Sequence, residues 1–117
     1  MRYYKSVRFS VREYLTADGR SPYREWLEGL DTPVRARVQA RVLRFELGNL
    51  GDHKSVGEGV EEARLAFGPG HRIYFGMHGR TVILLLLGGD KSSQAKDIRE
   101  ARKHWVDFVE AKRHGKA

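Results

Sequence analysis

The apolar residues of the chain follow a strand pattern at the start and again in the second half. Between Tyr3 and Tyr14, aromatic and apolar residues alternate loosely with polar ones, which favours a first strand. The segment from Gly48 to Gly59 is glycine-rich and polar, and it is predicted to be a loop. Three apolar stretches separated by glycine-containing turns then predict an antiparallel meander, namely Glu61–Phe67, Ile73–Met77 and Thr81–Leu87.

Helical spacing occurs between these two regions and again at the C-terminal end. Ser21 and Pro22 are typical of a helix start, and a short helix is predicted to run to Leu30. A second helix, closed by Gly48, carries an apolar stripe of Val34, Val38, Val42 and Phe45. A last helix is predicted from about Ser93 to Arg113, and its docking face consists of Ile98, Ala101, Trp105 and Phe108.

The order of these elements is strand, two helices, three strands and a helix. It predicts an α+β fold in which an N-terminal helix hairpin and a C-terminal helix pack on a small antiparallel sheet. The 117 residues contain no linker and suit one domain over residues 1–117. The longest apolar run is too short to cross a bilayer and the N-terminus has no signal-type segment, so we expect a cytoplasmic protein that does not contact membranes.

Charge and composition limit the partners, the metal sites and the catalytic groups that the chain can have. Lys and Arg number 22 against 15 Asp and Glu, and the net charge of +7 would attract nucleic acid or an acidic protein. The absence of cysteine excludes disulfides, zinc–thiolate sites and thiol nucleophiles. No histidines or carboxylates have the spacing of a metal site, so neither a metal nor another cofactor is expected.

The most informative segment is the run from Val82 to Leu87, followed by Gly88-Gly89 and then Asp90-Lys91-Ser92-Ser93. The strand is predicted to stop at the glycine pair, which permits a sharp turn and close approach of a partner. Lys91 and the two hydroxyls would then lie at the rim of the sheet, where an anion commonly binds. Capping of the last helix is the more common role for Ser93.

Three cations from separate segments are expected to converge on one face of the sheet: Arg64, Arg72 and Lys91. A phosphodiester would be their natural ligand, because guanidinium groups bind phosphate through two hydrogen bonds and lysine acts as a mobile charge. The alternative is that Glu61, Glu62 or Asp90 pairs with them on a solvated surface.

Further candidates lie on either side of these cations. His53 is a candidate for proton transfer and Lys54 for phosphate contact, although a loop histidine is often only a surface residue. One of Tyr74 and Phe75 should face the core, and Tyr74 is predicted to be the exposed one that stacks on a base. The second helix adds a basic stripe of Arg37, Arg41 and Arg44, which we expect to bind RNA.

With these residues the chain resembles the addiction-module killer proteins, the HigB-like branch of the RelE/ParE toxin superfamily. The resemblance runs from Tyr23 to Trp105 and rests on five ordered blocks: Arg35–Val38, Gly48–Lys54, Val56–Val60, Gly68–Phe75 and Gly88–Gln94. It implies the toxin of a type II toxin–antitoxin module, silenced by a helix-turn-helix antitoxin and reaching operator DNA only through that antitoxin. RelE-type members cleave messenger RNA on the ribosome without a metal, by attack of a 2′-hydroxyl on the adjacent phosphate.

By position, the resemblance gives catalytic roles to Arg64, Arg72 and Lys91, and Ser92 next to Lys91 is expected to contact RNA. Two departures leave the acid and the base open among His53, Lys54 and Asp97. RelE-like members often carry a lysine pair where this chain has Glu62 and Arg64, and a tyrosine near Asp97. ParE-type relatives share the fold but inhibit DNA gyrase without cutting RNA, and a degenerate toxin would only bind its antitoxin. These two alternatives stay open.

Overall fold

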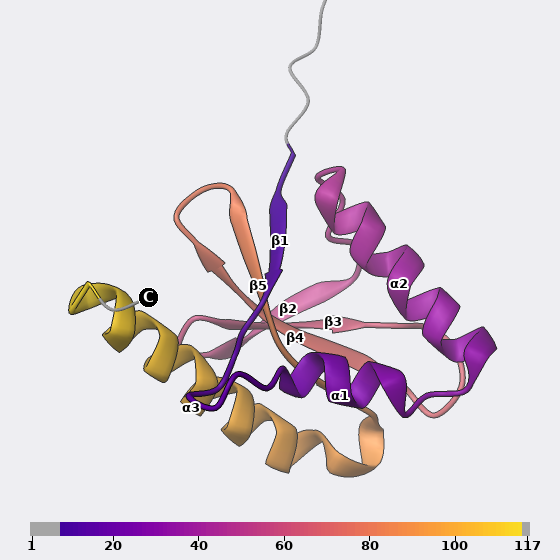
Figure 1. The fold of residues 1–117 in the computed structure, drawn as a ribbon. Coiled ribbons are helices and arrows are strands. Elements are labelled where there is room, and N and C mark those ends of the chain that lie inside the picture. Colours follow the sequence, from indigo (N-terminus) through magenta and orange to yellow (C-terminus); the bar gives the residue numbers. More distant parts are fainter. Residues whose placement is uncertain (1–7, 116–117) are drawn as a thin grey trace, which may run out of the picture.

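The computed structural model describes residues 8–115 and shows an α+β fold around one five-stranded sheet (Figure 1). In chain order the elements are β1 (Ser10–Glu13), α1 (Pro22–Glu28), α2 (Thr32–Glu46), β2 (His53–Gly57), β3 (Val60–Arg64), β4 (Arg72–His78), β5 (Val82–Gly89), the 3₁₀ turn η1 (Lys91–Ser93) and α3 (Gln94–Arg113). The strand order is β1-β5-β4-β3-β2, and β1 runs parallel to β5 while the other neighbours are antiparallel. The prediction of a wholly antiparallel sheet is therefore wrong. A parallel pair needs a long crossover, and here it spans everything between the first and last strands.

The three predicted helices are confirmed. The Ser21 hydroxyl accepts a hydrogen bond from the Arg24 amide at 3.0 Å and so caps α1 as expected. Of the strand predicted between Tyr3 and Tyr14, residues 3–7 lie outside the described part of the chain, and β1 covers only Ser10–Glu13. None of the helices within residues 8–115 is long and apolar enough to span a bilayer.

The predicted loop from Gly48 to Gly59 is wrong over its second half. His53–Gly57 forms β2, an edge strand that pairs antiparallel with β3. The strand has few apolar residues because its outer edge faces solvent, and backbone pairing with β3 holds it in place. The predicted order consequently lacks one strand between α2 and α3.

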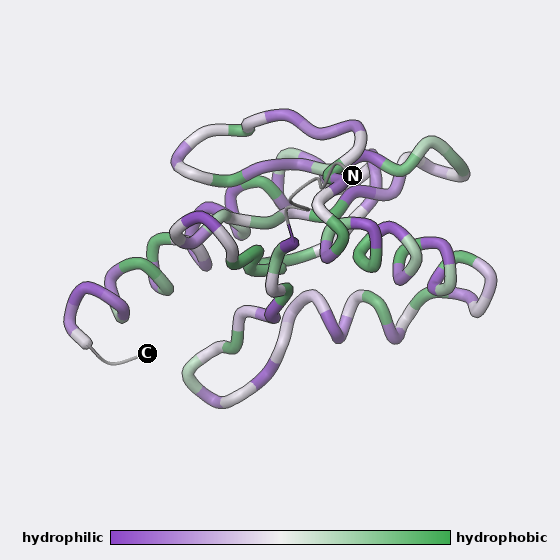
Figure 2. Tube along the Cα trace, turned by 90° about the horizontal axis from the view of Figure 1, so that it is seen from above, coloured by the Kyte–Doolittle hydropathy of each residue, from purple (hydrophilic) through white to green (hydrophobic). Residues whose placement is uncertain are grey.

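Both faces of the sheet are covered, each by its own apolar core. Along β5, Ile83 and Leu85 point to the core under α1 and α2, while Leu84 and Leu86 point to the core under α3. Trp105, predicted on the docking face of the last helix, packs against the α3 core, and Trp26 packs against the α1–α2 core; both are partly buried. Figure 2 shows hydrophobic and hydrophilic segments alternating along α3, as expected for a helix with one apolar side.

The glycine pair lies inside β5, so the prediction that the strand stops before it is wrong. What approaches the two glycines closely is a side chain of the same chain on each face of the sheet. A Cβ on Gly88 would lie 2.0 Å from Trp26 Cε3, and a Cβ on Gly89 would lie 1.9 Å from Asp97 Oδ2. Only a hydrogen side chain leaves room for the two neighbours.

Candidate nucleic-acid interface

Three cations predicted to converge do lie at one corner of the sheet, and we call them the cationic row: Arg64, Arg72 and Lys91. Arg64 on β3 is directly opposite Arg72 on β4, and Arg72 is opposite Gly89 on β5. Directly opposite residues of neighbouring strands point to the same face, here the face covered by α3. A Cβ on Gly70 would lie 3.1 Å from Arg72 Nη1 and 3.4 Å from Lys91 Cβ, so these two cations flank the same glycine.

The members of the cationic row differ in their surroundings. The Arg72 side chain is 7% exposed, its Nε lies 3.4 Å from Glu62 Oε2, and its Nη1 donates to the Gly70 carbonyl at 2.6 Å. Arg64 is exposed, and its Nε lies 3.5 Å from Asp52 Oδ2. Lys91 is exposed and forms no ion pair with any residue in the range 8–115. The row therefore combines one fixed guanidinium with two accessible cations.

Beneath the row is a polar cluster made of buried Glu62, Arg72 and Tyr74 and partly buried Gln94. Glu62 Oε2 accepts hydrogen bonds from the Tyr74 hydroxyl at 3.1 Å and from Gln94 Nε2 at 2.9 Å. The other carboxylate oxygen, Oε1, is buried without a hydrogen-bond partner among the described residues. Glu62 is 1% exposed and was not predicted as a central residue of the site, because its sequence position shows only a polar residue in a strand.

The prediction that Tyr74 is exposed to a ligand is wrong. Its side chain is fully buried, as is that of Phe75, because the α1–α2 core and the α3 core cover opposite faces of β4. Burial raises the pKa of the Tyr74 hydroxyl, and the neighbouring Glu62 carboxylate raises it further. Tyr74 is therefore a neutral hydrogen-bond donor that orients the Glu62 carboxylate.

Asp97 lies in the first turn of α3, next to this cluster. It is 7% exposed, and it accepts a hydrogen bond from the Ser93 hydroxyl at 2.5 Å. Burial raises the pKa of the Asp97 carboxyl, and the Ser93 hydrogen bond opposes this shift only in part. The predicted cap by Ser93 is wrong, since its side chain makes no capping bond to a backbone amide and serves Asp97 instead. Ser92 is exposed, and its amide and hydroxyl both donate to Asp90.

His53 and Lys54 are neighbours in β2 and so point to opposite faces of the sheet. Lys54 is opposite Glu62, which places it on the face of the cationic row, and it is exposed. His53 is opposite Ala63, on the face of α1 and α2, where its Nε2 lies 3.9 Å from Glu61 Oε1. The structure therefore places Lys54 on the face of the cationic row and His53 on the opposite face.

The basic stripe of α2 separates into one structural and two accessible arginines. Arg41 is 7% exposed and donates to the carbonyls of Arg64 at 2.7 Å, Leu50 at 3.0 Å and Asp52 at 2.8 Å, so the prediction that it contacts RNA is wrong. Burial also lowers the pKa of Arg41. Arg37 and Arg44 are exposed and line a groove of about 280 Å³. Its other wall is Leu65–Phe67, for which the sequence predicted no functional role.

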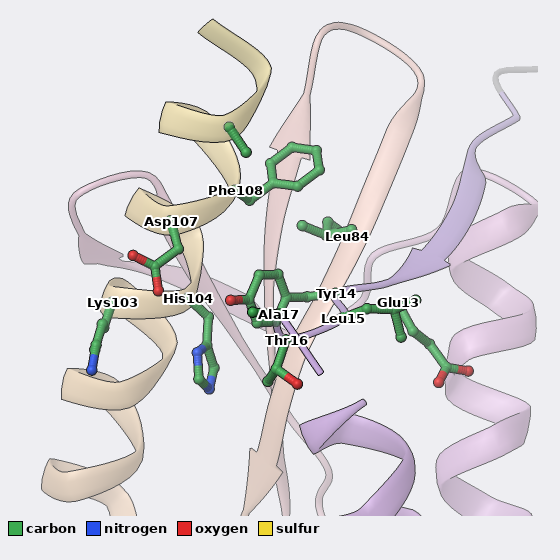
Figure 3. Close-up of a pocket in the computed structure, with 11 residues that line it drawn as sticks. Glu13, Tyr14, Leu15, Thr16, Ala17, Leu84, Lys103, His104, Asp107 and Phe108 are labelled. Carbon is green, nitrogen blue, oxygen red and sulfur yellow. The ribbon is translucent and has the colours of Figure 1, made fainter. Parts of the chain in front are cut away.

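A hollow of about 710 Å³ lies beside the second half of α3 (Figure 3). Tyr14, from the segment after β1, stacks there on His104 of α3 with ring centroids 4.8 Å apart. Leu84 and Phe108 add apolar walls, and Figure 3 shows these side chains around the opening. Lys103 is the one cation among its lining residues, so it offers much less to a phosphate than the cationic row.

Chemically, the cationic row suits a phosphodiester. A guanidinium fixed by a buried carboxylate presents its remaining donors in a defined direction, and the two exposed cations add charge beside it. The range 8–115 contains no group of three or more His, Asp or Glu residues that could hold a metal ion. The described side chains at this corner are cations, carboxyls and hydroxyls, which can bind a phosphate and transfer protons.

Comparison with known proteins finds a relative but no function. A protein of Haemophilus influenzae (strain ATCC 51907 / DSM 11121 / KW20 / Rd), named as an uncharacterized protein, is 42% identical over 78 residues. The match covers 66% of this chain and 79% of the relative. No protein-family model matches the chain, and no solved structure matches it.

Proposed function

The chain belongs to the same family as this Haemophilus influenzae protein, and we propose that it is the toxin of a type II toxin–antitoxin module. In this proposal it belongs to the HigB-like branch of the RelE/ParE superfamily, has a RelE-like fold, and cleaves messenger RNA on the ribosome in the cytoplasm without a metal. One observation carries the proposal, namely the register that puts Arg64, Arg72 and Lys91 at one corner of the sheet.

The proposed reaction breaks one phosphorus–oxygen bond and forms another. The 2′-hydroxyl loses its proton and attacks the adjacent phosphorus, and the 5′-oxygen leaves and takes up a proton, giving a 2′,3′-cyclic phosphate and a 5′-hydroxyl. The cationic row binds the non-bridging oxygens, whose negative charge grows in the transition state. Lys54 and Asp97 are the candidates for proton transfer, because both lie on the α3 face of the sheet. Ser92, beside Lys91, would contact the RNA backbone.

The proposed partners follow from charge. The net charge of +7 favours RNA and the ribosome, and it also favours an acidic segment of a helix-turn-helix antitoxin. Contact with operator DNA would occur only through that antitoxin.

The decisive test separates catalysis from folding. Lys91→Ala and Arg64→Ala remove exposed cations, so both variants should keep the wild-type melting temperature but cleave ribosome-bound message roughly 10²–10³ times more slowly. Arg80→Ala is the matched control, because Arg80 is an exposed cation in the turn between β4 and β5, at the other end of these strands (Figure 1). Mapping of transcript 5′ ends after induction measures cleavage. Intact messages in growth-arrested cells would refute the nuclease.

A second candidate is a toxin-like protein that binds without cutting, and one observation favours it. Arg72 is paired with buried Glu62, and Arg64 lies near Asp52, so two of the three cations already face a carboxylate. Such a protein would inhibit gyrase in the manner of ParE-type relatives, or would only bind its antitoxin. A supercoiling assay with purified protein tests the first possibility, and harmless overexpression would indicate the second.

A further inference from the structure

We infer that the groove formed by Arg37, Arg44 and Phe67 is a stacking subsite for one unpaired nucleotide of the RNA strand. The inference rests on the proposed function and extends it, because it adds a contact for an unpaired nucleotide on the α1–α2 side of the sheet, across the β3–β4 turn from the cationic row. We call this groove the stacking groove. Its three residues come from α2 and from the turn between β3 and β4.

An aromatic ring and a guanidinium already lie together in the stacking groove. Arg37 Cζ is 4.7 Å from the centroid of the Phe67 ring, within the range of a cation–π contact. Arg37 is exposed, so the outer side of its guanidinium is open to solvent. A nucleobase stacks readily on such a plane, since bases stack on guanidinium groups as well as on aromatic rings.

Arg44 supplies charge along the same helix. It lies about two helical turns from Arg37, so both side chains leave α2 on the same side, and both line the groove. Neither arginine forms an ion pair with a described residue, in contrast to Arg72 and Arg64. A phosphate beside the stacked base would therefore find Arg44 without displacing a carboxylate.

A short turn connects the stacking groove to the cationic row. The Phe67 ring lies 5.8 Å from the ring of His71, which directly precedes Arg72. In the same turn, the Pro69 carbonyl accepts a hydrogen bond from the Lys91 amide at 3.3 Å. The stacking groove lies on the α1–α2 side of the sheet and the cationic row on the α3 side, so one RNA strand would cross this turn to contact both sites.

Single-stranded RNA fits the stacking groove better than an acidic peptide does. An aspartate or glutamate side chain would use the charge of Arg37 and Arg44 but has no flat face to place against the Arg37–Phe67 pair. A nucleotide uses both features, because its phosphate takes the charge and its base takes the plane. The aromatic residue is therefore the one that distinguishes the two ligands.

The experiment measures binding of a short, labelled, single-stranded 2′-O-methyl RNA to the full chain by fluorescence anisotropy. Methylation removes the attacking hydroxyl, so binding is observed without cleavage. Phe67→Leu keeps an apolar side chain but removes the ring, and it should raise Kd at least about fivefold. Phe67→Tyr should bind as the wild type does. Arg80→Ala is again the matched control and should leave Kd unchanged.

Salt dependence separates the two parts of the stacking groove. Arg44→Ala should reduce the slope of log Kd against log salt by about 0.7, the value for one phosphate contact on a single strand. Phe67→Leu should leave that slope unchanged, because stacking releases no counterion. Melting curves of each variant verify that the protein is folded.

Several results would overturn the inference. If Phe67→Leu binds the RNA as tightly as the wild type while the wild type still cleaves message, the stacking groove is not a subsite and the proposed function stands. If polyglutamate binds with the same loss in Phe67→Leu, the groove takes an acidic peptide instead. If the wild type neither binds the RNA nor cleaves message, the proposed function fails together with the inference.

Discussion

Gly88 and Gly89 are adjacent in β5, yet they face opposite sides of the sheet. One of these sides is apolar and the other is polar. Gly88 faces the indole of Trp26 and the apolar core under α1 and α2. Gly89 faces the carboxylate of Asp97, next to the polar cluster under the first turn of α3. Both positions need glycine for the same steric reason, but what fills the freed space is a hydrophobic ring on one side and a buried acid on the other.

The two sides of the sheet therefore contribute differently to the stability of the fold. On the Trp26 side, burial of apolar surface stabilises the fold directly. On the Asp97 side, charges have been removed from water, which is tolerated only while each one keeps a partner. Glu62 Oε1 and Arg72 Nε have no hydrogen-bond partner among the described residues. Buried polar atoms without hydrogen bonds destabilise the fold. Their position next to the cationic row is typical of a functional site.

The largest expected effect comes from removing the central acid of the polar side. Glu62→Ala leaves Arg72 buried without its carboxylate and should lower the free energy of unfolding by about 3–5 kcal/mol. Asp52→Ala is a matched control, because Asp52 lies 3.5 Å from Arg64 much as Glu62 lies 3.4 Å from Arg72, but on the surface. That control should cost at most about 1 kcal/mol. Denaturant titration measures both, and equal losses would remove the contrast between the two sides.

The next effect tests the apolar side. Gly88→Ala places a methyl group 2.0 Å from Trp26 Cε3 and should destabilise the protein by about 1–3 kcal/mol through overpacking. Gly29→Ala provides the comparison, because its new Cβ would meet its nearest neighbour at 3.5 Å. If Trp26→Leu restores part of the stability lost in Gly88→Ala, the indole is the obstacle. A thermal melt in which both alanine variants match the wild type would disprove the close packing.

The smallest effect concerns pH. Burial raises the pKa of Asp97 above its usual 3.8, so the folded protein holds this proton more tightly than the unfolded chain. The stability that Asp97 contributes is therefore complete below the unfolded pKa and is lost as pH rises through the folded pKa. Asp97→Asn has no charge to bury and should flatten this decline, because its amide oxygen still accepts from Ser93. Denaturation midpoints from acidic to neutral pH measure the slope, and identical slopes in both proteins would contradict the prediction.

Local patterns predicted the helices and the β3–β4–β5 meander, and the meander in turn predicted the cationic row. Arg64 and Arg72 face each other because a short turn between antiparallel strands fixes their register. The pairing of β1 with β5 joins segments far apart in sequence and left no local signal. The burial of Arg41 and Tyr74 was not predicted, for a related reason. Both side chains carry polar atoms, which suggested exposure to solvent. In the structure these atoms form hydrogen bonds with groups that only the fold brings near.

The guanidinium of Arg41 joins three segments that the chain connects only at a distance. It holds the carbonyls of Leu50 and Asp52, just before β2, together with that of Arg64 at the end of β3. The Arg64 amide also donates to the Asp52 carbonyl at 3.0 Å. A local opening that frees this amide for hydrogen exchange would also strain the Arg41 contacts, so we expect the edge of the sheet beside the accessible cations to open together with α2.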